Sequence, residues 1–134
     1  MFDFLYNILN AKYRLALPSV ATVEDIQVVL QQVKYIETST GSLVDPEIVW
    51  GKKEANCVQF ASLAIPLLES IGKQPQAVAM TCQNPANNHA ITVWTELTEL
   101  NYFSDANLRQ TTFTDIDALV KNIMHDLISW KILS

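Results

Sequence analysis

The sequence predicts an α+β domain in which helices pack on a small antiparallel sheet. Residues 2–15, 23–36 and 57–71 carry apolar side chains at helical spacing, whereas residues 76–105 hold short runs rich in β-branched and aromatic residues, separated by turn-forming segments. Helices, then an antiparallel meander, then a last helix make an α+β plan. The chain has 134 residues, 49% of them hydrophobic, so we expect a single domain over 1–134 with one core.

The N-terminal part predicts helices within residues 2–36. Apolar residues recur at helical spacing over 2–15 and again over 23–36, and a proline separates the two segments. A long loop over 37–54 follows, because this stretch contains both glycine and proline. We expect one turn of helix inside it, near 46–50.

The central helix is expected over 57–71. Asn56 is a favoured N-cap residue, and Gly72 is the residue type that most often follows a helix end. Apolar side chains on most sides of this helix indicate that it is buried. Pro66 lies inside the helix and predicts a kink, because it removes one intrahelical hydrogen bond.

Strands are expected over 76–83, 89–97 and 101–105, with a polar turn over 84–88. The chain then closes with a predicted helix over 115–130, whose apolar residues again follow the helical period. Thr114 is the expected N-cap of that last helix, and acidic residues occupy its first turn.

Cys57 is the first candidate for chemistry because it stands at the N-terminus of the central helix. Unpaired N–H groups and the helix dipole stabilise a thiolate there, so we expect a lowered pKa for Cys57. The same N–H groups can hold an oxyanion. A thiol nucleophile also needs a base, and the chain has only two histidines, His89 and His125. His125 falls within the predicted last helix and is expected to be a partly exposed residue that complements the helix dipole.

His89 opens a predicted strand, and Asp105 ends the next one. Strand alternation places the two side chains on one face only if the hairpin loop between them has an odd number of residues or contains a bulge. We therefore expect such a loop near 97–102. The alternative readings are a buried, inert Cys57, a polar strand-edge histidine and a turn-capping aspartate.

A zinc site built from Cys57, Cys82, His89 and His125 has no recognisable ligand spacing, so neither a metal nor a cofactor is expected. The net charge of −5 and the pI near 4.8 argue against nucleic acid and anionic membranes as partners. The first residues lack the charge order of a signal peptide, and no apolar run is long enough to span a bilayer. We expect a cytoplasmic protein with free thiols.

The stretch from the second helix to Asp105 resembles the transglutaminase-like superfamily of papain-fold cysteine enzymes. The matching motifs are VKYIE around Tyr35, A-N-C-V-Q-F-A at 55–61, L-L-E-S-I-G at 67–72, H-A-I-T-V at 89–93 and Y-F-S-D-A-N at 102–107. The resemblance covers more than half of the chain and is closest to small members of bacterial or phage type. It implies a papain-like or transglutaminase-like core.

The resemblance also implies roles for three residues. Cys57 would be the nucleophile, His89 the general base and acid, and Asp105 the residue that orients the histidine. The reaction would be acyl transfer from the amide carbonyl of a protein or peptide, with hydrolysis, deamidation and transamidation all open. Trp50 is a candidate oxyanion donor through its indole N–H, and its alternative role is an aromatic plug over the core.

The sequence departs from the family pattern close to the cysteine. Ala55 stands where the family usually has glycine, and Val58 and Gln59 replace acidic residues that many members carry. These departures keep two alternatives open. One is a catalytically silent interaction module on the same fold, and the other is a plain structural domain without a site.

Overall fold

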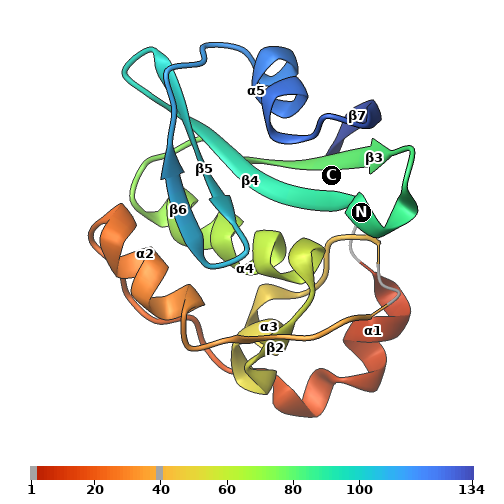
Figure 1. Ribbon diagram of the computed structural model, residues 1–134. Helices are drawn as coiled ribbons and strands as arrows, with labels where there is room; N and C mark the ends of the chain where they lie inside the picture. Colours follow the sequence, from red (N-terminus) through yellow and green to blue (C-terminus); the bar gives the residue numbers. More distant parts are fainter. Residues whose placement is uncertain (1–2, 39–40) are drawn as a thin grey trace.

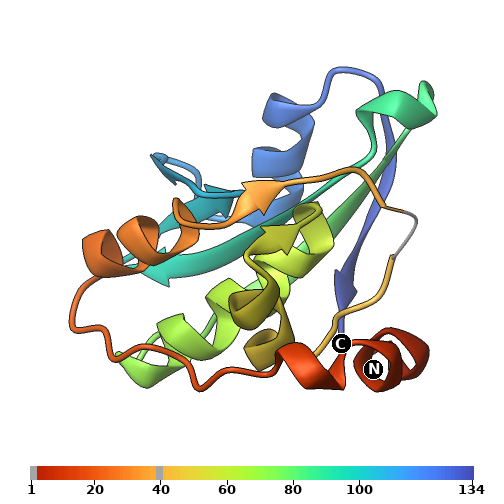
Figure 2. The same ribbon diagram turned by 90° about the horizontal axis from the view of Figure 1, so that it is seen from below.

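The computed structural model describes residues 3–38 and 41–134. Its centre is a five-stranded antiparallel sheet with helices on both faces (Figures 1 and 2). The strand order is β6-β5-β4-β3-β7. The strands are β3 (Gln76–Cys82), β4 (His89–Glu96), β5 (Glu99–Ser104), β6 (Asn107–Gln110) and β7 (Leu127–Leu133). The α+β architecture with an antiparallel sheet is as predicted.

Among the described residues, four α-helices precede the strands of this sheet in the chain, and a fifth covers its other face. The helices are α1 (Phe4–Leu9), α2 (Val23–Leu30), α3 (Pro46–Lys52), α4 (Cys57–Ser70) and α5 (Ile116–Ile123), with 3₁₀ turns η1 (Ala11–Tyr13) and η2 (Pro85–Asn87). Helix α4 packs along β3, β4 and β5, and α2 and α3 pack against α4 (Figure 1). In the part of the chain that the structure describes, no helix combines the length and apolarity needed to cross a bilayer.

The sheet separates two apolar clusters. On the α4 side, Trp94 and Phe103 pack ring against ring with centroids 5.3 Å apart, and both belong to the same cluster as Leu63 of α4. On the α5 side, Ile91 of β4 packs with Leu119 of α5. Neighbouring residues of one strand therefore serve different clusters, as strand alternation requires.

Helix α4 agrees closely with the sequence prediction. Asn56 is its N-cap, and its helical residues run from Cys57 to Ser70. Gly72 has a φ of +86° and donates to the carbonyl of Glu69, while the next N–H bonds the carbonyl of Leu68. These two bonds form a Schellman motif, which confirms Gly72 as the residue just past the helix end.

The segment expected as one helix over 23–36 is wrong at its C-terminal end. Helix α2 stops at Leu30, and β1 (Lys34–Tyr35) pairs in parallel with β2 (Glu54–Ala55). The N–H of Ile36 donates to the carbonyl of Ala55 at 2.9 Å. This pairing holds Tyr35 beside the residues that lead into α4, an arrangement that no local pattern specifies.

The predicted first helix over 2–15 is also shorter than expected. Helix α1 ends at Leu9 and is followed by the 3₁₀ turn η1, and residue 2 lies outside the described residues. Its apolar side chains are largely exposed, for example Phe4 at 78% and Leu9 at 66%. Their helical spacing therefore does not mark a buried face in the chain as described.

The predicted C-terminal helix over 115–130 is wrong in its second half. Helix α5 ends at Ile123, and residues 127–133 form β7 along the free edge of β3. The N-cap of α5 is Asp115, whose side chain accepts a hydrogen bond from the N–H of Ala118, and not Thr114. The edge of β3 offers backbone hydrogen bonds that outweigh the helical apolar period of this segment.

The β4–β5 hairpin contradicts the expected odd loop. Glu96 pairs with Glu99, so the turn has two residues, Leu97 and Thr98. The register is therefore shifted by one residue from the expected one. Ser104, not Asp105, is the residue of β5 that comes onto the face of His89.

The hairpin turn gives a stability prediction. Leu97 is fully exposed and has a φ of +56°, a conformation that costs a leucine about 1 kcal/mol and a glycine almost nothing. We expect Leu97→Gly to raise the urea unfolding midpoint, with a gain of up to about 1 kcal/mol. Thr98→Gly is the matched control: Thr98 lacks a positive φ, so this change should destabilise. Equal losses in both variants would contradict the prediction.

A close backbone contact joins α3 to the N-terminal segment. A Cβ placed on Gly51 would lie 1.5 Å from the carbonyl oxygen of Tyr13 and 2.7 Å from its carbonyl carbon. The adjoining N–H of Leu15 donates to the carbonyl of Glu47 in α3. Only glycine permits this approach, because the obstacle is backbone and not a movable side chain.

Candidate active site

The N-terminus of α4 is held by a reciprocal capping box. The side chain of Asn56 accepts from the N–H of Gln59 at 2.9 Å, and the side chain of Gln59 accepts from the N–H of Asn56 at 2.9 Å. Asn56 also donates to Thr38 Oγ1 at 2.6 Å. These bonds fix the first turn, where Cys57 lies. The role of Gln59 was not predicted, although the spacing of Asn56 and Gln59 is the capping-box signal.

Cys57 is half-buried and packs against Ala90 of β4 and Leu43. Burial raises the pKa of the Cys57 thiol. A hydrogen bond from the N–H of Ala90 opposes that rise, the charge of Asp105 adds to it, and the N–H groups of Val58 and Cys57 oppose it. The predicted lowering of this pKa is therefore wrong in sign. Helix N–H groups do act on the sulfur, but the loss of water around it dominates.

His89 is the first residue of β4 and immediately precedes Ala90, which belongs to the apolar cluster against which Cys57 packs. Its Nε2 lies 2.8 Å from Ser104 Oγ at the end of β5. Burial lowers the pKa of His89, while the negative charge of Asp105 acts to raise it. The imidazole is therefore neutral at pH 7 and can accept a proton.

Asp105 lies in the turn between β5 and β6 and has a φ of +52°. It is therefore not a strand residue, and the alternation of side chains along a strand, from which its position was predicted, does not apply to it. Burial raises the pKa of its carboxyl group, the charge of His89 opposes that rise, and Glu37 adds to it. Its Oδ1 is buried and has no hydrogen-bond partner among the described residues. The structure thus brings Asp105 into the neighbourhood of Cys57 and His89 without a hydrogen bond to either.

Tyr35 and Glu37 complete the surroundings of the thiol. The phenol of Tyr35 donates to Glu37 Oε1 at 3.2 Å, and its ring stacks on Phe60 with centroids 6.5 Å apart and an interplanar angle of 8°. Burial, the charge of Cys57 and the charge of Glu37 raise the pKa of Tyr35 to about 12. Its hydroxyl is therefore protonated and can donate a hydrogen bond. The VKYIE motif marked Tyr35, but only the β1–β2 pairing shows what it faces.

Trp50 lies in α3 and is buried in the same cluster as Trp94, whereas Cys57 packs in a separate small cluster. The ammonium group of Lys53 lies 3.2 Å from the centroid of the Trp50 ring, and it donates to the carbonyl of Trp50. Burial in this cluster agrees with the alternative role of Trp50 as an aromatic plug over the core. Its role as an oxyanion donor stays a prediction.

The remaining thiol and imidazole have surroundings of their own. Cys82 is 2% exposed in β3, and its Sγ approaches the carbonyl of Asn87. His125 is exposed and lies in the turn between α5 and β7, not in a helix as predicted. Across residues 3–38 and 41–134, no three His, Cys, Asp or Glu side chains come close enough together to hold a metal ion.

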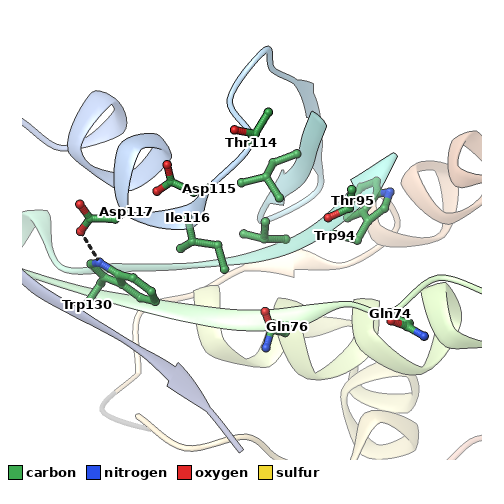
Figure 3. A pocket seen from close by; sticks show the side chains of 11 residues that line it. Gln74, Gln76, Trp94, Thr95, Thr114, Asp115, Ile116, Asp117 and Trp130 are labelled. Atoms are coloured by element: carbon green, nitrogen blue, oxygen red, sulfur yellow. Dashed lines mark hydrogen bonds between the residues drawn. The ribbon is translucent and has the colours of Figure 1, made fainter. Parts of the chain in front are cut away.

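The other face of the sheet carries a cavity of about 440 Å³ between α5, β4 and β7 (Figure 3). Trp130 and Asp117 line it and are joined by a hydrogen bond of 2.9 Å from the indole N–H. Cys57, His89 and Asp105 are not among its lining residues. This cavity is therefore separate from the candidate site.

Comparison with known proteins gives a likeness in fold. No family model matches the sequence, and no curated protein matches it significantly. A solved structure from Cytophaga hutchinsonii, described as a "putative cysteine protease", matches 97% of this chain with a TM-score of 0.54 and 17% identity. The match covers 48% of that protein, so the chain spans about half of its length. The likeness is consistent with a papain-like core.

Proposed function

We propose that the chain is a thiol-dependent acyl-transfer enzyme of transglutaminase-like type that acts on amide bonds of a protein or peptide. The observation that carries the proposal is the position of Cys57, in the first turn of α4 and packed against the cluster that contains Ala90, the residue after His89. In this proposal Cys57 is the nucleophile, His89 is the base, and the N–H groups at the start of α4 are the oxyanion donors. The fold likeness to a protein described as a cysteine protease supports it.

The pKa directions define the first step. The Cys57 thiol is protonated and the His89 imidazole is neutral, so His89 takes the thiol proton as the sulfur attacks the carbonyl carbon. The carbonyl oxygen becomes an oxyanion, which N–H groups at the start of α4 can stabilise. Asp105 lies close enough for its charge to stabilise the imidazolium that forms.

In the second step, the imidazolium of His89 gives its proton to the leaving nitrogen, the carbon–nitrogen bond breaks and a thioester with Cys57 remains. Water then attacks the thioester while His89 accepts a proton from it, and the thiol leaves with that proton. An amine in place of water gives transamidation. Release of ammonia from a side-chain amide gives deamidation. In our proposal the enzyme is a small cytoplasmic protein of bacterial or phage type.

Two observations favour a second candidate, a catalytically silent interaction module. Burial raises the pKa of Cys57, and Asp105 makes no hydrogen bond to His89 among the described residues. A site that has lost its reaction would show the same features. Measuring the reactivity of the thiol separates the two candidates.

We expect iodoacetamide to alkylate Cys57 in the folded protein with a rate that rises about tenfold per pH unit up to pH 9. The reason is that the thiol pKa lies above its usual value of 9.0, so the thiolate fraction grows throughout this range. Mass spectrometry of the alkylated protein gives the rate at each cysteine.

Cys82 is the internal control, because its 2% exposure should delay alkylation until the protein unfolds. A plateau of the Cys57 rate between pH 5 and pH 7, well below the usual thiol pKa, would show a thiolate–imidazolium pair instead. A Cys57 that reacts only on unfolding would favour the silent module.

A further inference from the structure

The imidazole of His89 has one hydrogen-bond partner among the described residues, the hydroxyl of Ser104. The distance from Nε2 to Oγ is 2.8 Å, and both side chains are partly buried. The β4–β5 register explains this contact. Thr92 pairs with Phe103, so Ser104 comes opposite Ile91, on the face that His89 shares. A regular two-residue hairpin therefore fixes the pair.

Asp105, one residue later, does not replace this contact. It lies in the β5–β6 turn with a positive φ, and its buried Oδ1 has no hydrogen-bond partner. Its carboxylate affects the charge state of His89 from nearby. A carboxylate that acts without a hydrogen bond can stabilise charge, but it cannot fix the direction of a ring.

We propose that Ser104 is the positioning residue of the site: its Oγ accepts a hydrogen bond from the Nε2–H of His89 and thereby leaves the Nδ1 lone pair free to take the proton of Cys57. Asp105 supplies negative charge without a hydrogen bond. The assignment rests on the proposed function, because it concerns the base of that reaction. The family resemblance implies that Asp105 alone orients the histidine. In this assignment Ser104 orients the ring and Asp105 supplies the negative charge.

The chemistry of a hydroxyl suits this division. A serine oxygen accepts the Nε2–H bond both in the neutral imidazole and in the imidazolium, so the ring keeps its direction throughout the proton transfer. A neutral acceptor stabilises the imidazolium less than a hydrogen-bonded carboxylate does. Loss of Ser104 should therefore disturb the tautomer of His89 more than its charge.

Nitrogen NMR of the imidazole tests the assignment directly. A His125→Gln background leaves His89 as the only histidine, so its two ring nitrogens can be read without overlap. We expect the Nε2–H tautomer to dominate in this background and in Ser104→Thr, which keeps the hydroxyl. In Ser104→Ala the second tautomer should become populated, and kcat should fall about 10- to 100-fold.

Asp105→Asn is the matched comparison. It should keep the Nε2–H tautomer and shift the His89 titration to lower pH, because a negative charge near the ring is lost. An unchanged tautomer in Ser104→Ala, or a tautomer change in Asp105→Asn alone, would overturn the assignment. The NMR readout needs no turnover, so it remains decisive even if Cys57→Ala shows that the proposed reaction does not occur.

Discussion

Cys57→Ala is expected to lower amide turnover by at least about 10³-fold, and His89→Ala to lower it similarly, because nucleophile and base act as one unit. Casein is a suitable first substrate, since new amino termini report hydrolysis and free ammonia reports deamidation of its glutamines. Asp105→Asn should reduce turnover less than Cys57→Ala, because it removes stabilising charge and not the reacting group.

His125→Gln is the control for this series. His125 is exposed in the turn between α5 and β7 and has no role in the proposed reaction, so its loss should leave turnover unchanged. Turnover by Cys57→Ala equal to that of the unmodified chain would exclude a thiol mechanism. Full turnover by Asp105→Asn would show that the carboxylate has no part in the reaction and serves only the β5–β6 turn.

Phe103→Ala should destabilise the fold by about 3–5 kcal/mol, the largest stability effect we expect from a single substitution. Phe103 is 1% exposed, and its ring packs on Trp94 in the apolar cluster on the α4 side of the sheet. Its truncation leaves a cavity that rigid strands on both sides cannot fill. Urea unfolding gives the difference in free energy.

Ile128→Ala is the matched control for this change. Ile128 lies in β7 and is 63% exposed, so its truncation should change the free energy of unfolding by less than about 0.5 kcal/mol. A loss with Phe103→Ala as small as that with Ile128→Ala would mean that the α4-side cluster is not packed as described.

The elements that the sequence specified well are those with strong local signals. Helix α4 was predicted to within one residue because Asn56 and Gly72 mark its ends and apolar residues fill the interval. The strand starting at His89 was found for a similar reason, since β-branched and aromatic residues dominate it. In both cases local chemistry and tertiary packing favour the same structure.

The errors arise where distant segments compete with local pattern. Leu127 and Trp130 continue the helical period of α5, yet their segment pairs with β3, whose edge lies about fifty residues earlier in the chain. The end of α2 was missed likewise, because β1 depends on pairing with β2. Local propensity cannot report such partners.

The candidate site shows the same limit at finer scale. The position of His89 next to Cys57 stays a prediction, and a one-residue difference in the hairpin places Ser104 and not Asp105 against the imidazole. The sign of the Cys57 pKa shift depends on how far the sulfur is removed from water. Burial of a single atom is a property of the assembled fold.

The contact between Gly51 and the carbonyl of Tyr13 has an evolutionary consequence. Every other amino acid carries a Cβ, so position 51 should stay closed to substitution in descendants that keep this backbone. It lies six positions before Cys57, so a short cysteine motif gains a second conserved residue at a defined distance. A search for distant kin can therefore demand both residues at this spacing, which separates lineages that share this packing from chains that match the cysteine motif by chance.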